Sequence, residues 1–218
     1  MTDVVLPLLI AVPILAAVAP LLLSLRTSET GWYVAAVATA IEAGLAAVVL
    51  SAVYDGARLV HAVGGYPAPY GIELVVDGFS APVVALIAVV SLGVVAFART
   101  GGPRRNSFYS AYLLLVGGLM GISITGDLFN MFVFLEITGL GTYALVASDR
   151  SDRSAIAALK YLILGTMGAS LFLIGVGYAF IMTGTLNMAD LSARLAGTYT
   201  SRPVLASFGF IVIGLGLK

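Results

Sequence analysis

Long apolar runs, separated by short polar segments, fill almost the whole sequence. About 20 apolar residues, at a helical rise of 1.5 Å each, span the ~30 Å hydrocarbon core of a bilayer. Runs of about this length lie at residues 4–25, 33–53, 79–98, 108–125, 126–147 and 155–182, and a seventh run starts at about 203. The pattern predicts an all-α, polytopic bundle of transmembrane helices with six complete spans.

The seventh run, PVLASFGFIVIGLGLK, has only 16 residues, fewer than the ~20 needed to cross. It ends on a charged residue, Lys218. A helix that stopped within the membrane would leave up to four carbonyl groups without partners. We therefore expect a truncated seventh span, and a sequence that is the front part of a longer protein or one piece of a split subunit.

The polar segments between the runs predict smaller features outside the membrane. In the longest loop, residues 54–78, two short segments flank the turn-rich sequence GGYPAPYG and predict a hairpin. The charged loop SDRSDRS offers Ser151 and Ser154 as helix N-caps. Residues 187–197 are polar and predict a short helix at the membrane interface.

The distribution of arginine predicts the orientation of the bundle. The first, third and fifth loops contain Arg26, Arg99, Arg104, Arg105, Arg150 and Arg153. The second, fourth and sixth loops contain Arg58, Arg194 and Arg202. Because cytoplasmic loops carry an excess of Lys and Arg, this bias predicts that the amino terminus and the hairpin lie outside.

Composition agrees with a membrane protein and excludes other classes. Hydrophobic residues make up 60% of the chain and charged residues only 10%. The chain has no cysteine and a single histidine, His61, so neither a disulfide framework nor a thiolate or histidine-rich metal site is expected. A net charge of zero gives no indication of nucleic-acid binding. We expect no metal and no cofactor, and a multi-pass protein of the cell membrane that functions within the bilayer.

One carboxylate, Glu136, lies near the middle of the run 126–147, about 14 Å of helix from Asp127. A charge at the bilayer centre costs ~2.5–3.5 kcal/mol on insertion scales, so such residues usually face a packed or hydrated interior and take part in transport. At helical spacing its neighbours are Phe129, Phe132, Val133, Gly139, Leu140 and Tyr143. The alternative is a neutral acid that is hydrogen-bonded between helices. Glu136 is the main candidate functional residue.

Three other ionisable residues are further candidates. Glu42 lies near the middle of the second span and is either functional or in contact with a lipid headgroup or a partner subunit. Lys160 lies about two turns inside the sixth span. It either snorkels to the headgroups or points inward, toward the fifth helix. Asp127 lies in the short turn that makes the fourth and fifth spans antiparallel neighbours.

Four segments together resemble a known family. Residues 104–147, which contain GDLFN and FVFLEI, are similar to the fourth and fifth helices of the antiporter-like subunit superfamily. Mrp-type multisubunit sodium/proton antiporters, respiratory complex I and membrane-bound hydrogenases contain subunits of this superfamily. LVVDGFSAP, ALKYLILGT and GLGLK resemble the entry to its third helix, its sixth helix and the start of its seventh-helix lysine motif. The fifth-helix motif is most similar to the D-type subunit of the Mrp antiporters.

The resemblance implies roles for individual residues. Glu136 matches the essential fifth-helix glutamate, and Lys218 matches the lysine of the interrupted seventh helix with which that glutamate forms a charge pair. Lys160 matches a lysine that is common in the sixth helix, whereas Glu42 has no counterpart. Residues 1–107 would be three N-terminal helices with an external hairpin, and residues 108–218 an incomplete first five-helix repeat. A complete proton path is therefore not expected in this chain.

Three hypotheses for the function remain open. The first is a membrane subunit of a multisubunit Na⁺/H⁺ antiporter that carries protons through an intramembrane Glu–Lys charge relay, with other membrane subunits as partners. The second is the same relay in the proton-translocating arm of an NADH/quinone oxidoreductase or a membrane-bound hydrogenase. The third is a structural subunit that conducts nothing. Protons, Na⁺ and the lipid bilayer are the expected partners, and no motif of an independent enzyme is present.

Overall fold

The computed structural model describes residues 2–25, 30–102, 105–149 and 151–218. Its helices are α1 (Thr2–Leu23), α2 (Gly31–Tyr54), α3 (Ser80–Gly101), α4 (Asn106–Ile124), α5 (Leu128–Val146), α6 (Asp152–Thr183), α7 (Met188–Leu195) and α8 (Arg202–Leu217). Strands β1 (Leu59–Ala62) and β2 (Glu73–Val76) form an antiparallel hairpin between α2 and α3. The fold is mostly helical, as predicted.

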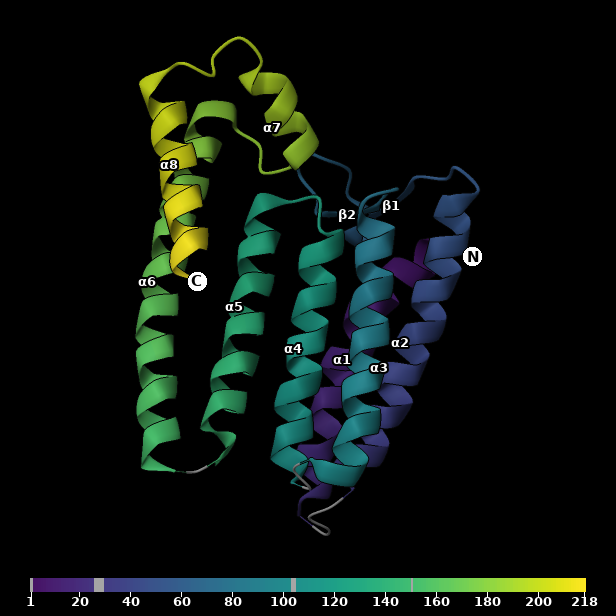
Figure 1. The fold of residues 1–218 in the computed structure, drawn as a ribbon. Coiled ribbons are helices and arrows are strands. Elements are labelled where there is room, and N and C mark those ends of the chain that lie inside the picture. Colours follow the sequence, from purple (N-terminus) through teal and green to yellow (C-terminus); the bar gives the residue numbers. More distant parts are fainter. Residues whose placement is uncertain (1, 26–29, 103–104, 150) are drawn as a thin grey trace.

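Within the described residues, six helices, α1 to α6, are long and apolar enough to cross a membrane. They stand side by side and alternate in direction (Figure 1). The hairpin and α7 lie at one end of the bundle, and α8 runs back from that end along α6 and stops about half-way (Figure 1). The six predicted spans and the shorter apolar helix are therefore confirmed.

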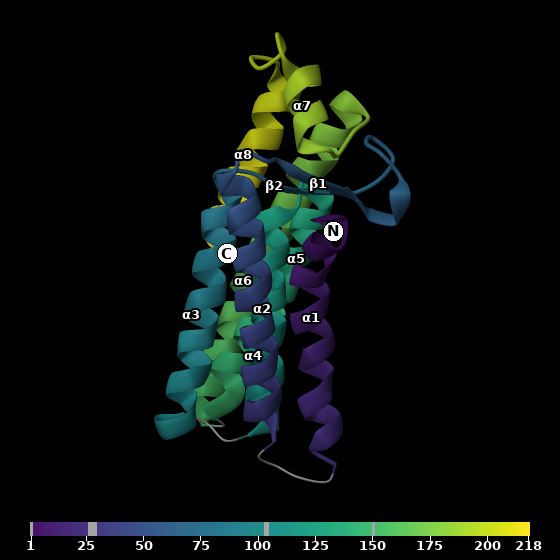
Figure 2. The same ribbon diagram turned by 90° about the vertical axis from the view of Figure 1, so that its right-hand side faces the viewer.

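The first four helices pack around one hydrophobic core. Helix α1 contacts α2 and α4, and α2 also contacts α3 and α4. Figure 2 shows α2 in front, flanked by α1 and α3, with α4 behind it. The core residues of α1 to α3 are mainly small or β-branched, and the core residues of α4 are larger, among them Tyr109, Leu113 and Met120. This set of helices is called the α1–α4 group below.

Glycines on α4 allow two close helix contacts. A Cβ at Gly117 would lie 2.6 Å from Ile14 Cγ1 of α1, and a Cβ at Gly121 would lie 2.3 Å from Phe134 of α5. Both glycines therefore allow close packing, as their four-residue spacing predicts. Two positions that are four residues apart on a helix differ in direction by about 40°. Because α4 lies between α1 and α5, Gly117 meets α1 and Gly121 meets α5.

Several boundaries differ from the predicted ones by a few residues. Helix α6 begins at Asp152, earlier than the predicted 155, because Ser151 caps it by accepting a hydrogen bond from the Ser154 N–H at 3.1 Å. The polar helix predicted at 187–197 covers only Met188–Leu195, and Asn187 is its N-cap. The predicted orientation rests partly on Arg26, Arg104 and Arg150, which lie outside the described residues.

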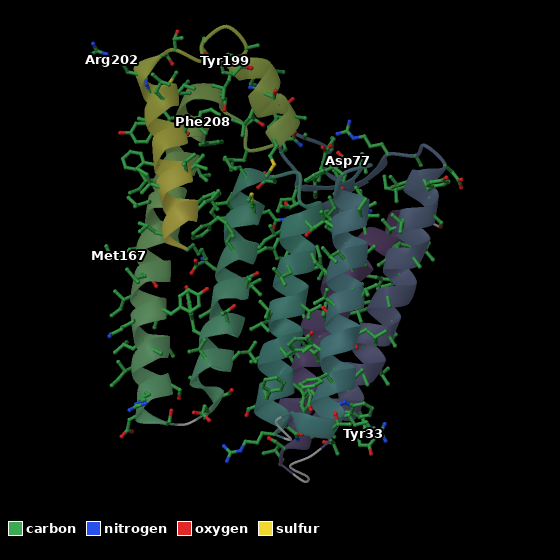
Figure 3. All side chains as sticks on the ribbon, viewed as in Figure 1. Tyr33, Asp77, Met167, Tyr199, Arg202 and Phe208 are labelled. Atoms are coloured by element: carbon green, nitrogen blue, oxygen red, sulfur yellow. The ribbon has the colours of Figure 1, made fainter. Side chains whose placement is uncertain are left out.

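The ends of the bundle carry polar and aromatic groups. Figure 3 shows Arg202 and Tyr199 at the end near α7, and Tyr33 at the opposite end. At the Tyr33 end, the Arg99 guanidinium lies over the Trp32 ring, 4.6 Å from its centroid, and the Trp32 indole N–H donates to the carbonyl of Val95 at 2.8 Å. Arginine and aromatic residues at both ends are typical of membrane interfaces.

Candidate functional site

Glu136 and Lys218 form an ion pair in the middle of the bundle. Glu136 is the ninth residue of α5, and Lys218 follows the last residue of α8. The Lys218 Nζ donates a hydrogen bond to Glu136 Oε1. The Lys218 side chain is 12% exposed and that of Glu136 is 34% exposed. The structure therefore brings together the two residues that the resemblance predicted to pair.

Close packing of α8 on α6 determines where Lys218 lies. A Cβ at Gly214 would lie 2.6 Å from the carbonyl oxygen of Gly168, and a Cβ at Gly168 would lie 2.7 Å from the carbonyl oxygen of Gly214. Two turns earlier in α8, the Ser207 hydroxyl donates to the Gly175 carbonyl at 2.7 Å. Because small residues let the two backbones touch, α8 is held against α6 and its end reaches α5.

Aromatic side chains lie on both sides of Glu136 between α5 and α6. One turn before it, Phe132 stacks on Phe172 of α6, with ring centroids 6.4 Å apart and planes at 12°. Two turns after it, Tyr143 meets Tyr161 of α6 edge to face, at 5.0 Å and 78°. These contacts flank the carboxylate on both sides along the α5–α6 contact, while the Glu136 side chain itself stays 34% exposed.

A close approach at Gly139 occurs within one helix. A Cβ at Gly139 would lie 3.0 Å from the hydroxyl oxygen of Tyr143, one turn further along α5. The same hydroxyl fills the space over Gly165 of α6, where a Cβ would lie 1.8 Å away. The two glycines therefore make room for the Tyr143 hydroxyl on the Glu136 face of α5.

The two groups of the pair are complementary in charge and in hydrogen bonding. A carboxylate accepts hydrogen bonds, and an ammonium group only donates them. Opposite charges at contact distance also attract each other. Within the described residues, no group of three or more His, Cys, Asp or Glu side chains could hold a metal ion.

Lys160 lies apart from the pair. Its side chain is exposed on α6, about 12 Å of helix from the start at Asp152. Within the described residues it forms neither an ion pair nor a side-chain hydrogen bond. The structure thus leaves it on the outer surface of this chain instead of directing it toward Glu136.

Glu42 is separated from the pair by α4, which packs against α2 on one side and α5 on the other. Its side chain is 0% exposed, and both carboxyl oxygens are buried without a hydrogen-bond partner. Because the chain itself encloses this carboxyl group, it contacts neither a lipid headgroup nor a partner subunit in this arrangement.

Asp127 has a structural position at the start of α5. Its Oδ1 accepts the Asn130 N–H at 2.8 Å, which makes it the N-cap of α5. Its backbone also forms a bridge with Asn187, the N-cap of α7, which accepts the N–H groups of Ala189 and Asp190. The two helices therefore begin side by side.

One interaction at this place was not predicted from the sequence. The Asn187 side-chain amide donates to Glu73 Oε2 of β2 at 2.8 Å, and the Gly126 N–H donates to the Glu73 carbonyl at 2.8 Å. We refer to Glu73, Asp127 and Asn187 as the loop junction. The segments Thr125-Gly126-Asp127 and Thr185-Leu186-Asn187 share a Thr-x-Asx pattern before a helix, which is the sequence signal for this feature.

Comparisons with known proteins agree with the fold. The family described as "NADH:quinone oxidoreductase/Mrp antiporter, TM" matches residues 125–218. The chain is 43% identical to NADH-quinone oxidoreductase subunit N of Desulforudis audaxviator, over 97% of this chain and 43% of that one. It is 35% identical to the D-type subunit of a Na⁺/H⁺ antiporter of Bacillus subtilis, over 99% of this chain and 44% of that one.

A solved structure shows the same arrangement of helices. A chain of the membrane-bound sulfane sulfur reductase, an archaeal respiratory membrane complex, superposes with a TM-score of 0.89 at 35% identity, over 97% of this chain and 44% of that one. The present chain thus spans less than half the length of the relatives it matches. It is a multi-pass membrane protein that belongs to the family of antiporter-like subunits shared by Mrp antiporters and complex I-like complexes, and it corresponds to their N-terminal portion.

Proposed function

We propose that this chain moves protons within a multisubunit membrane complex, with Glu136 and Lys218 as the charge pair that gains and loses them. The observation that carries the proposal is the contact between Lys218 Nζ and Glu136 Oε1 half-way along α5. An ion pair at this depth is costly to bury. The aromatic contacts on both sides of Glu136 and the close α6–α8 packing support the proposal, because they fix the positions of the two side chains.

The proposed mechanism uses the two states of the pair. While the residues touch, the ammonium group keeps the carboxylate ionised. When a nearby charge or water parts them, the desolvated carboxylate takes up a proton and the ammonium group releases one. A relay of such groups, linked by water, passes protons along the middle of the membrane. Residues 108–218, the incomplete five-helix repeat of the prediction, contain both members of the pair.

Lys160 belongs to the proposed relay on one condition. A lysine that faces hydrocarbon at this depth is unfavourable unless it reaches the headgroups. Another subunit, or a further segment of protein, would have to cover the exposed face of α6 for Lys160 to exchange protons with Glu136.

The energy source differs between two candidate complexes. We propose a Na⁺/H⁺ antiporter, because the sequence GDLFN…FVFLEI around Glu136 most resembles the D-type antiporter subunit and the chain is 35% identical to such a subunit. The second candidate is a redox-driven pump, which the 43% identity to subunit N favours. Purification of the native complex and intact masses of its subunits distinguish the two, since flavin or iron–sulfur subunits accompany only the pump.

The substitution Glu136→Gln tests the function itself. We expect the complex containing this variant to assemble normally and, after reconstitution into vesicles, to lose proton transport by about 100-fold, the scale of a removed proton-transfer group. Thr142→Val is a matched control, because the Thr142 hydroxyl only bonds the Thr138 carbonyl of its own helix. Transport at the wild-type rate in Glu136→Gln would contradict the proposal.

A further inference from the structure

Glu42 is a second ionisable group in the middle of the bundle, and the Glu136–Lys218 pair does not use it. It lies half-way along α2, eleven positions after Gly31 and twelve before Tyr54. Its side chain is 0% exposed, and neither carboxyl oxygen has a hydrogen-bond partner. Buried polar groups almost always have partners, so this carboxyl group requires a ligand that the contacts of the chain do not supply.

The helices that pack against α2 contain a single positively charged residue among their described residues. Helix α2 packs against α1, α3 and α4. The apolar run of α1, residues 4–25, has no ionisable side chain, and α4 contributes only Tyr109 and Tyr112. The Tyr112 hydroxyl donates to the Ser91 carbonyl of α3 at 3.0 Å. Helix α3 contributes only Arg99, in its last turn.

Arg99 is too far along the bundle to neutralise Glu42. Its guanidinium lies over Trp32, near the start of α2. Ten residues of α2, about 15 Å of helix, separate Trp32 from Glu42. The other ionisable residues of α2, Tyr33 and Tyr54, lie in its first and last turns. Glu42 thus differs from Glu136, which has Lys218 as its counter-charge.

An ionised carboxylate in this position would be far more costly than a neutral carboxylic acid. We propose that Glu42 is an intramembrane proton-binding site: it holds a proton in the arrangement described here, and it exchanges that proton with water that enters the α1–α4 group during transport. On release, the carboxyl O–H bond breaks and the proton passes to a water oxygen, which leaves a carboxylate and a hydronium ion. Uptake is the reverse.

Helix α1 provides a place where such water could be held. Pro13, in the middle of α1, has no N–H group, so the carbonyl of Leu9 lacks the usual donor four residues later. Leu9 and Pro13 are both buried, and α1 packs directly on α2. A water molecule in a membrane protein needs such free polar groups, and the Ser110 hydroxyl of α4, buried without a hydrogen-bond partner, is another in the α1–α4 group.

Infrared spectroscopy of the purified complex tests the protonation directly, because the carbonyl stretch of a carboxylic acid differs from that of a carboxylate. We expect the wild-type spectrum at neutral pH to contain an acid band that is absent in Glu42→Met and present in Glu136→Gln. If the acid band is still present in Glu42→Met, Glu42 is ionised in the wild type and the proposal is overturned.

Transport measurements distinguish a proton-exchanging acid from a merely structural one. Methionine has a similar size to glutamate and removes the unpartnered oxygens, so Glu42→Met should fold at least as stably as the wild type. We nevertheless expect its transport to fall by about 100-fold, and Glu42→Asp to restore part of it with a shifted pH profile. Wild-type transport in Glu42→Met would show that the acid only fills space.

Two controls separate this proposal from the proposed function, on which its transport readout rests. Thr39→Val lies one turn from Glu42, and its hydroxyl bonds only the backbone of its own helix, so we expect no change. If Glu136→Gln transports normally, the proposed function fails, whatever Glu42→Met does. If Glu136→Gln is inactive and Glu42→Met is active, only the proposal for Glu42 fails.

Discussion

The Lys218 ammonium group donates to the Glu136 carboxylate across 82 positions of sequence, and the contact joins the end of α8 to the middle of α5. Helix α8 contacts α6 closely through Gly168 and Gly214, and α6 in turn packs on α5. The geometry of the ion pair therefore depends on the glycines of the α6–α8 contact, and a Cβ at one of them, Gly168, would lie 3.3 Å from the backbone nitrogen of Lys218.

The contact between Gly168 and Gly214 predicts that a single methyl group disturbs the pair. In Gly214→Ala, the new Cβ would lie 2.6 Å from the Gly168 carbonyl oxygen and the Phe172 nitrogen, so α8 must move. We expect a loss of stability of about 1–3 kcal/mol, typical of overpacking, together with reduced transport. Gly209→Ala is the matched control on the same helix, since nothing lies within 4 Å of its Cβ. Equal transport by the two variants would show that the pair does not depend on this contact.

The loop junction predicts a stability effect at Asn187. Asn187→Ala removes the N-cap of α7 and the hydrogen bond to Glu73. Loss of an N-cap costs about 0.5–2 kcal/mol. Glu73→Gln keeps an oxygen that can accept the Asn187 amide, so we expect a smaller change. Unfolding of both variants in detergent, followed by circular dichroism, measures the difference, and a larger effect of Glu73→Gln would contradict this assignment.

We expect Asp77, in the loop before α3, to make a pH-dependent contribution to the stability of the fold. The N–H groups of Ser80 and Phe79 and the Ser80 hydroxyl donate to its carboxylate, which lowers the pKa of Asp77 below its ordinary 3.8. A carboxyl group whose pKa is lower in the folded state stabilises the fold above its ordinary pKa, and this contribution disappears as the pH falls through the folded value. The wild type should therefore unfold at a higher temperature than Asp77→Ala at pH 7, and the difference should shrink in acid. A difference that is constant with pH would exclude this cause.

The effect of replacing Lys160 on proton transport depends on what covers the exposed face of α6. In the intact complex, Lys160→Met should lower proton transport if the lysine takes part in the relay, while leaving the Glu136–Lys218 contact in place. Lys160→Arg keeps the charge and serves as the control. If Lys160→Met transports like the wild type, the lysine snorkels to the headgroups and has no part in the relay.

Hydropathy was sufficient to predict the spans, because length and apolar composition are what a bilayer selects. The cap at Ser151 could be located because its side chain acts within three residues of its own position. The burial of Glu42 could not be decided, because the two faces of α2 have almost the same apolar composition. The exposed position of Lys160 was left open for the same reason.

Interactions between distant segments were the hardest to predict. The pair of Glu136 and Lys218 was expected only through the resemblance to a family, since no periodicity connects α5 with α8. Glu73 and Asn187 are 114 positions apart, and neither lies in a strong motif. Likewise, the spacing of Gly117 and Gly121 indicated close packing but not the identity of the partner helices, which depends on the order of the helices in the bundle.

A double-mutant cycle measures the central claim most directly. Proton transport by the reconstituted complex would be compared among the wild type, Glu136→Gln, Lys218→Met and the variant with both substitutions. If the residues act as one pair, each single change should abolish most of the transport and the double variant should be no worse than either. If the two effects multiply, or if either single variant transports at the wild-type rate, the two residues do not act as a pair.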